Sequence, residues 1–221
     1  MAFSKTQIDK LGDRLKAGSV EEQDLRDLDE YRRSFGTVYE GVRSAIHLGL
    51  GYLPTGRPAK TTQSIVAKLR RESIRLSQIQ DIAGCRIVVV DLEHQDEAVR
   101  SLMLLFPHAK IDDRREEPSH GYRAVHLIGE ANGKLIELQV RTVLQHLWAQ
   151  VSEKLSDMVH PDVKYGGGPA AIAHELAEAS MNLAALEYAL SQPPVIDASR
   201  AVHEVVSRLL RLIPDSGKGS E

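Results

Sequence analysis

The most constraining feature of this chain is the stretch HGYRAVHLIGEANGKLIELQVRT, residues 120–142. At its middle, Asn132-Gly133 is the strongest short signal for a two-residue hairpin turn, because both residues tolerate positive φ. The pattern predicts an antiparallel hairpin over residues 122–141, in which the residue before the turn pairs with the residue after it. The turn therefore fixes which side chains of the two strands share a face.

Polar side chains occupy every second position of the strand that follows the turn. Successive side chains of a strand point to opposite faces, so these polar groups lie on one side of the sheet. The residues predicted to share that face are Tyr122, His126, Glu137, Gln139 and Arg141. A solvated sheet face is the ordinary interpretation. A binding surface is the alternative, and the rest of the chain has to decide between them.

The remaining pattern predicts an α+β fold, a mixed sheet flanked by helices, because helices precede and follow a strand-rich middle. One long helical pattern runs from an S-x-x-E capping box at Ser19 to Gly49 and Gly51. A Gly/Pro loop then leads to a second helix, capped by Thr61 or Thr62.

CRIVVV, residues 85–90, is short and β-branched, which indicates a buried central strand. A helix is expected next, after which the chain returns toward HAKID, residues 108–112. After Thr142 the pattern predicts a helix, the loop HPDVKYGGGP, a long helix that Pro193-Pro194 stops, a final helix over about 198–212 and a polar tail.

The composition bounds the class of protein. Hydrophobic residues make up 42% of the chain and charged residues 27%, which are globular values. A net charge of −3 argues against a general nucleic-acid coat protein. The single cysteine, Cys85, excludes an internal disulfide and a multi-cysteine zinc site. No signal-peptide core or membrane-length apolar run is present, so we expect a soluble, cytoplasmic protein with no membrane partner.

A phosphate-binding face is suggested by RPAKTTQSIVAKLRR, residues 57–71. Lys60, Ser64 and Lys68 recur at four-residue steps and would line one face of a helix, with Arg57 in the loop ahead. Lysines and helix-end amides suit a polyphosphate. An ordinary amphipathic helix with extended lysines is the alternative.

Two carboxylates are candidates for a Mg²⁺ site. Asp81 comes just before the CRIVVV strand and Arg86 lies within it, where a charge needs a partner or a ligand. A structural Asp81–Arg86 ion pair would also satisfy both groups. If Asp81 and Glu137 converge beside the lysines, they would share a hard cation with phosphates. Arg114, Arg115 and Arg123 add positive charge, with exposed loop positions as the alternative.

Four blocks in this order resemble the synthetase domain of the RelA/SpoT family, from about Gly56 to Gly168. They are K-x3-S-x3-K, D-x-x-x-x-R-I, GYRAVH, and E-L-Q-V-R-T followed by QHLWA. The resemblance implies a single-domain small alarmone synthetase with a nucleotidyltransferase-like fold. It divides the chain into a helical segment (1–50), a pyrophosphokinase core (51–168) and C-terminal helices with a tail (169–221).

The resemblance also implies a reaction, in which Mg²⁺ assists transfer of the β,γ-pyrophosphate of ATP to a ribose 3′-hydroxyl. By matching position, Asp81 and Glu137 would be catalytic and hold the metal. ATP would be bound by Arg57, Lys60, Ser64, Lys68 and Arg86. The acceptor would be bound by Tyr122, which stacks on the base, with Arg123, His126, Gln139 and Arg141.

Two departures from the family pattern concern Arg57 and the acceptor. Arg57 lies one residue further from Lys60 than in the usual R-x-K. The D-Y-I-x-x-P-K-x-N-G-Y stretch of alarmone-making members is replaced by DRREEPSHGY, and SEKLSD/KYGGG is similar to the toxic branch (toxSAS). We therefore expect the 3′-terminal adenosine of tRNA as acceptor, contacted by Arg114, Arg115, Lys154 and Lys164. An antitoxin partner, as in toxin–antitoxin or phage-defence pairs, would accompany that role.

Other acceptors and one rival class stay open. GDP or GTP would make the chain a (p)ppGpp synthetase of the stringent response, and adenosine nucleotides would give (p)ppApp. An inactive nucleotide-sensing or RNA-binding module is the rival of another class. The C-terminal helices are compatible with a homo-oligomer as well as with packing on their own core.

Overall fold

The computed structural model describes residues 3–192 and 198–213 of the chain. Two compact units are formed. The first contains Met1–Ile87, Arg100–Ile111 and His126–Gln139, and the second contains Val88–Val99, Asp112–Val125 and Val140–Glu221. The division into a helical segment, a core and C-terminal helices stays a prediction, because compactness does not test where a functional core begins.

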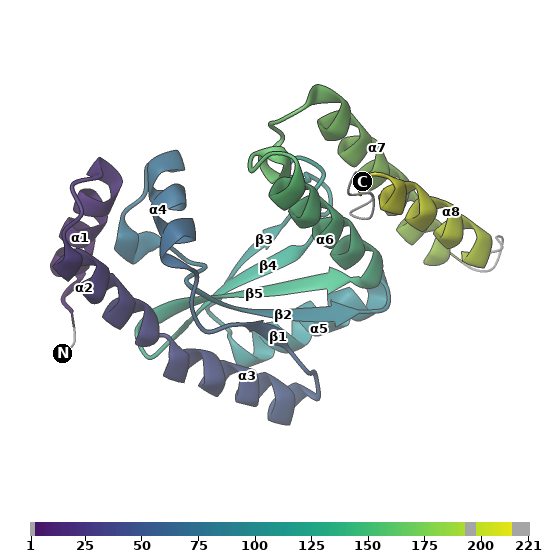
Figure 1. The fold of residues 1–221 in the computed structure, drawn as a ribbon. Helices are drawn as coiled ribbons and strands as arrows, with labels where there is room; N and C mark the ends of the chain where they lie inside the picture. The colour runs from purple at the N-terminus through teal and green to yellow at the C-terminus, as the bar shows by residue number, and fades with distance from the viewer. Residues whose placement is uncertain (1–2, 193–197, 214–221) are drawn as a thin grey trace, which may run out of the picture. The chain divides into compact units, whose positions relative to one another are not determined.

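A five-stranded mixed sheet confirms the α+β class. Its strands are β1 (Thr55–Arg57), β2 (Ala83–Val89), β3 (Lys110–Asp113), β4 (Val125–Ala131) and β5 (Lys134–Thr142). Their order in the sheet is β1-β2-β5-β4-β3 (Figure 1). The strand that ends in Val89 therefore lies next to the predicted hairpin.

The β4–β5 hairpin confirms the prediction from Asn132-Gly133. Both turn residues have positive φ, 51° for Asn132 and 72° for Gly133, as a two-residue hairpin turn of this hand requires. The first strand is shorter than predicted, because Tyr122 lies outside β4 and forms an isolated antiparallel bridge with Ser119. Tyr122 is thus a loop residue rather than a strand residue.

The helices of the first unit correct the prediction of one long N-terminal helix. They are α1 (Lys5–Ala17), α2 (Glu22–Arg33), α3 (Gly36–Leu50), α4 (Thr62–Arg71) and the 3-10 turn η1 (Leu76–Gln78). The predicted long helix is broken at Ser34 and Phe35. The predicted capping box at Ser19 is also wrong, because α2 begins after Glu21, whose backbone N–H donates to the carboxylate of the third helical residue, Asp24, at 3.1 Å. Helix α1 packs against α2, α4 and η1.

Strand β2 is the strand predicted from CRIVVV, but only one of its faces is fully buried. Cys85 and Ile87 are buried, whereas Val88 is 39% exposed. Tyr39 of α3 lies close enough to Cys85 for Cys85 to raise its pKa, and Arg43 and Glu40 of the same helix act on the pKa of Cys85. Helix α3 therefore covers the Cys85 face, and Gly84 and Arg86 lie on the opposite face.

Helices α6 (Val143–Met158), α7 (Ala170–Leu190) and α8 (Ala198–Arg211) pack on one another in the second unit, with η2 (Val163–Tyr165) against α6. Their shared core includes Trp148, Leu155, Leu183 and Leu209. Helix α5 (Leu92–Leu105) is the predicted helix after β2. Pro193-Pro194 and the polar tail lie outside the described residues. In the described part of the chain, every helix is too short or too polar to cross a membrane.

Candidate functional site

Two lysines converge on Asp81 in the first unit. Lys60 Nζ lies 2.5 Å from one carboxylate oxygen of Asp81, and Lys68 Nζ lies 3.0 Å from the other. All three side chains are at least four-fifths buried. Both carboxylate oxygens of Asp81 are therefore paired with lysines.

The backbone around Lys60 differs from the predicted continuous helix. Helix α4 begins at Thr62, and the Thr61 side chain caps it by accepting the Ser64 N–H at 3.2 Å. Lys60 lies just before the cap, outside the helix, and its backbone N–H donates to Ile82 O at 2.7 Å. Lys60 and Lys68 thus reach Asp81 from different elements, and only Ser64 and Lys68 belong to the helix.

Arg32 of α2 also contacts the backbone at Lys60 and the side chain of Thr62, a contact that the sequence did not predict. Its Nε donates to the carbonyl oxygen of Lys60 at 2.6 Å, and its Nη1 lies 3.3 Å from Thr62 Oγ1. An arginine inside a predicted amphipathic helix gives no sign of such a distant contact. Arg57 also differs from the prediction, because it pairs with Gly84 in strand β1 rather than lying in a loop.

The electrostatics of this cluster favour the ionised carboxylate. Burial by itself would raise the pKa of Asp81, but the charges and hydrogen bonds of Lys60 and Lys68 outweigh it and bring the pKa to about 2. Burial lowers the pKa of Lys60, and the attraction of Asp81 opposes that shift. The cluster therefore consists of two lysine side chains around a carboxylate that is ionised at neutral pH.

Glu137 is held in a defined orientation on β5. His126 Nδ1 lies 2.9 Å from one carboxylate oxygen, and Gln139 Nε2 donates to the other at 2.5 Å. The contact with His126 confirms that β4 and β5 place these polar residues on one face. Burial raises the pKa of Glu137, but the hydrogen bond and charge of His126, together with the hydrogen bond from Gln139, outweigh it, so the pKa lies below its usual value.

Asp81 and Glu137 are close enough to interact. The charge of Asp81 works against the ionisation of Glu137. A Cβ on Gly84 would lie 4.0 Å from Glu137 Cβ, which places Glu137 on the same face as Gly84 and Arg86. Two ionised carboxylates fit Mg²⁺, which commonly takes one or two protein carboxylates and completes its shell with phosphates and water. Among the described residues no cluster of three acidic, His or Cys side chains forms a closed metal site.

Tyr122 is fixed within the second unit by Arg141. The Arg141 Nη2 donates to the Tyr122 hydroxyl at 2.7 Å, and its guanidinium carbon lies 4.8 Å from the ring centroid. Arg114 lies 6.0 Å from the same ring. The alternation along β5 places Arg141 on the same strand face as Gln139 and Glu137.

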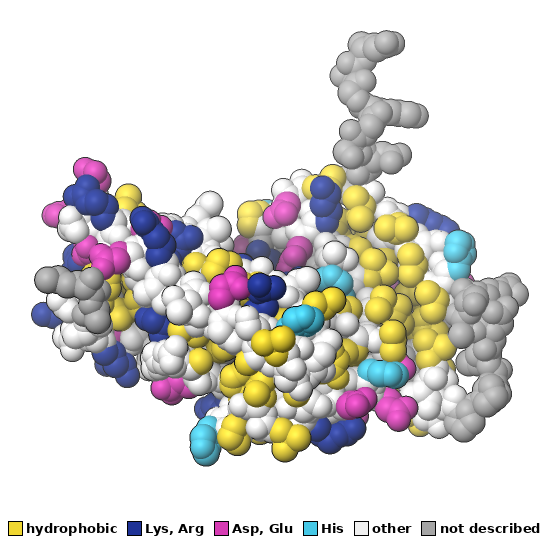
Figure 2. Space-filling view, turned by 90° about the horizontal axis from the view of Figure 1, so that it is seen from below, with side chains coloured by type: hydrophobic (Ala, Val, Ile, Leu, Met, Phe, Trp, Pro, Cys, Tyr) yellow, Lys and Arg dark blue, Asp and Glu magenta, His cyan; other side chains and the backbone are white. Residues whose placement is uncertain are grey.

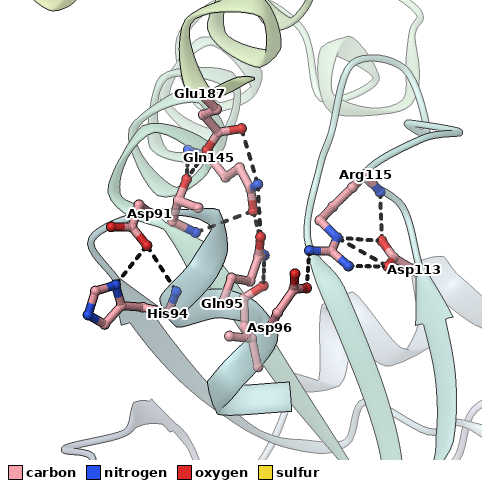
Figure 3. Close-up of polar contacts among 10 residues, drawn as sticks. Asp91, His94, Gln95, Asp96, Asp113, Arg115, Gln145 and Glu187 are labelled. Atoms are coloured by element: carbon pink, nitrogen blue, oxygen red, sulfur yellow. Dashed lines mark hydrogen bonds and ion pairs between the residues drawn. The ribbon is translucent and has the colours of Figure 1, made fainter. Parts of the chain in front are cut away.

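The basic residues predicted to touch tRNA, two arginines and two lysines, differ in whether they form ion pairs within the chain. Arg115 contacts Asp96 at 2.6 Å and also pairs with Asp113, so its charge is neutralised locally (Figure 3). Arg114 pairs with Asp112 at 2.6 Å. Lys154 and Lys164 are exposed. On the face shown in Figure 2, Lys and Arg side chains are interspersed with Asp and Glu rather than gathered in one basic patch.

Comparison with known proteins finds relatives over the middle of the chain. Residues 56–156 match the model of the region found in RelA / SpoT proteins. The uncharacterized protein Rv1366 of Mycobacterium tuberculosis is 36% identical over 127 residues, which cover 56% of this chain and 46% of that protein. The GTP pyrophosphokinase YwaC of Bacillus subtilis is 30% identical over 145 residues, covering 55% of this chain and 63% of that protein. The chain thus spans about half the length of the mycobacterial relative.

Solved structures agree on the fold. The small alarmone synthetase 1 from Bacillus subtilis, bound to its product pppGpp, superposes with a TM-score of 0.56 at 26% identity, covering 77% of this chain and 96% of that chain. A GTP pyrophosphokinase family protein from Streptococcus pneumoniae gives 0.58 at 22% identity, covering 86% and 98%. Residues 56–156 are thus similar to the region found in RelA/SpoT proteins, and the chain has the fold of the small alarmone synthetases.

Proposed function

We propose that this chain is a Mg²⁺-dependent pyrophosphokinase that transfers the β,γ-pyrophosphate of ATP to a ribose 3′-hydroxyl. The observation that carries the proposal is the pairing of Asp81 with Lys60 and Lys68 beside Glu137. Phosphoryl-type transfer needs mainly positioned reactants and neutralised phosphate charge, and this cluster offers both. The match to the RelA/SpoT region and the activity in the name of YwaC support the same reaction.

In this proposal the two lysines exchange partners when ATP binds. Lys60 and Lys68 turn from Asp81 to the phosphates, and Arg57, Ser64 and Arg86 complete the ATP site. Asp81 is then left to ligate Mg²⁺ with Glu137. When bound, Mg²⁺ neutralises charge that develops on the transferred group.

Glu137 acts on the acceptor through an oriented carboxylate. The acceptor 3′-oxygen attacks the β-phosphorus of ATP, the bond from that phosphorus to the α–β bridging oxygen breaks, and AMP leaves. Glu137 accepts the hydrogen bond of the attacking hydroxyl, whose proton passes on to water. The lowered pKa of Glu137 makes it a weak base, so its contribution as metal ligand and orienting group is the larger one.

Two acceptor classes are supported by different observations. A guanosine nucleotide has the more direct support, from a relative named GTP pyrophosphokinase and from a structure bound to pppGpp. The tRNA 3′ end is supported by the DRREEPSHGY departure and by exposed Lys154 and Lys164. The neutralised Arg115 and the mixed surface charge weaken the tRNA alternative. A toxin role with an antitoxin partner depends on the tRNA alternative.

A labelled-transfer assay distinguishes the acceptors. Pure protein and Mg²⁺ are incubated with γ-labelled ATP and, in separate tubes, GDP, GTP, AMP or deacylated tRNA. Label on a guanosine nucleotide supports a (p)ppGpp synthetase, label on AMP an adenosine alarmone synthetase, and label on tRNA a translation-blocking toxin. Failure of all four acceptors would refute the proposal and favour an inactive nucleotide-sensing or RNA-binding module.

A further inference from the structure

The loop Ser119–Arg123, here called the acceptor loop, has an unusual backbone. His120 and Gly121 both have positive φ, 53° and 87°. Positive φ is uncommon for a residue with a side chain, so His120 needs surrounding contacts to hold it there. The adjoining Tyr122 is the residue that the resemblance to RelA/SpoT synthetases implies for stacking on the acceptor base, and we extend the proposed function to include that role.

Helices α6 and α7 supply one side of those contacts. A Cβ at Gly121 would lie 2.7 Å from Trp148 Cζ2 and 3.2 Å from Ser180 Cβ, so this backbone lies directly against both helices. Trp148 is itself fixed, because its Nε1 donates to Leu176 O of α7 at 2.9 Å. The surface under Gly121 is therefore a junction between the two helices, which this hydrogen bond joins.

Ser180 of α7 forms hydrogen bonds on both sides of Tyr122. Its hydroxyl donates to the Gly121 carbonyl oxygen at 2.6 Å and accepts from Arg123 Nε at 3.1 Å. Ser180 is 2% exposed, so water does not compete well for these bonds. The side chain of Arg123 also donates to the Arg115 carbonyl oxygen.

A second polar connection links α7 to the strand end beside Arg141. Glu187 of α7 accepts hydrogen bonds from the hydroxyl of Thr142 and from Gln145 Nε2, and Gln145 is in turn bonded to Gln95 (Figure 3). Thr142 directly follows Arg141, whose guanidinium holds the Tyr122 hydroxyl. Helix α7 thus contacts both the backbone beside Tyr122 and the residue next to its side-chain partner.

We propose that α7 positions the acceptor loop, with Ser180 as the positioning residue that sets where Tyr122 presents its ring to the acceptor base. This inference rests on the proposed pyrophosphokinase function. It assigns the C-terminal helices a role in acceptor recognition, distinct from the ATP-binding lysines. Ser180 touches neither substrate and acts through Gly121 and Arg123.

Ser180→Ala tests the proposal, with Ser152→Ala as the matched control. Ser152 is a similarly buried serine on α6 whose hydroxyl has no hydrogen-bond partner among the described residues. We expect Ser180→Ala to raise the KM for the acceptor about ten-fold, because two buried groups lose their partner. The KM for ATP should stay unchanged, and Ser152→Ala should leave both constants unchanged.

Hydrogen exchange gives a readout that does not need turnover. The Tyr122 N–H donates to Ser119 O at 2.9 Å within the loop, and its exchange should accelerate in Ser180→Ala but not in Ser152→Ala. Unchanged exchange, or equal rises in both KM values, would overturn the positioning role. If the parent protein transfers pyrophosphate to no acceptor, the proposed function fails while exchange still decides whether α7 holds the loop.

Gly121→Ala perturbs the backbone of the acceptor loop directly and leaves the sequence of α7 unchanged. It therefore tests the proposal independently of whether Ser180→Ala folds. The added methyl group meets Trp148 at positive φ, so it should also raise the acceptor KM selectively. A Gly121→Ala variant with the parent's acceptor KM would contradict the proposal even if Ser180→Ala fails to fold.

Discussion

Replacing Asp81 by Asn should cost stability in a way that depends on pH. The pKa of Asp81 falls from 3.8 to about 2 in the folded chain. A shift of this size corresponds to roughly 2 kcal/mol of unfolding free energy, at about 1.4 kcal/mol per pKa unit. Because the folded pKa is the lower one, this contribution is fully present above pH 3.8 and is lost as the pH falls through about 2.

Urea unfolding of the parent and Asp81→Asn proteins at several pH values between neutrality and about pH 2 measures this contribution. Asp13→Asn is the control, because Asp13 is an exposed carboxylate on α1. The difference between parent and Asp81→Asn should shrink by about 2 kcal/mol over the acid range, whereas Asp13→Asn should follow the parent. A difference that stays constant from neutral to acid pH would refute the electrostatic role of the two lysines.

Three further results are expected. Glu137→Gln should lower pyrophosphate transfer by at least about 100-fold, because it removes the charge that would hold Mg²⁺ and orient the attacking hydroxyl. Calorimetry should show ATP binding largely retained, and a fully active variant would contradict the role of Glu137. Lys68→Ala should weaken ATP binding about ten-fold or more, because a charge-assisted contact to phosphate is lost. Arg70→Ala, an exposed cation on the same helix, should not, and equal losses in both variants would indicate only a general charge effect. Gly133→Ala should lower the unfolding free energy by about 1 kcal/mol in urea titrations, because the turn requires positive φ; an unchanged midpoint would contradict the turn assignment.

The hairpin and its polar face were predictable because the signals are local. Asn132-Gly133 determines the turn, and the period of two along β5 then places Glu137 with His126. The capping box at Ser4 and Gln7, which begins α1, is also visible in the sequence and was overlooked.

The break between α2 and α3 was not predictable from periodicity. Tyr31 and Phe35 keep the helical spacing through the break, and their rings meet edge to face with centroids 5.2 Å apart. Lys134 of β5 lies 4.7 Å from the Phe35 ring centroid. Such a contact is made across about a hundred residues of chain, so no local pattern reports it.

The candidate site shows the same division between local and distant causes. Residue types and block order pointed to Lys60, Lys68, Asp81 and Glu137, and the structure brings these side chains into one unit. The position of Lys60 outside α4 depends on its bond to Ile82 and on Arg32, which are tertiary contacts. Pattern alone therefore predicted side chains that the structure brings together, but not the elements that carry them, and their roles stay predictions.

The most direct test of the central claim is whether the β- and γ-phosphates of ATP move together. ATP labelled separately at both positions is incubated with the protein, Mg²⁺ and the acceptor that proves active, and the label in the product is measured. The account predicts equal amounts of β- and γ-label on the ribose 3′-oxygen, with AMP as the other product. Transfer of the γ-label alone, with ADP released, would make this an ordinary kinase and contradict the proposed reaction.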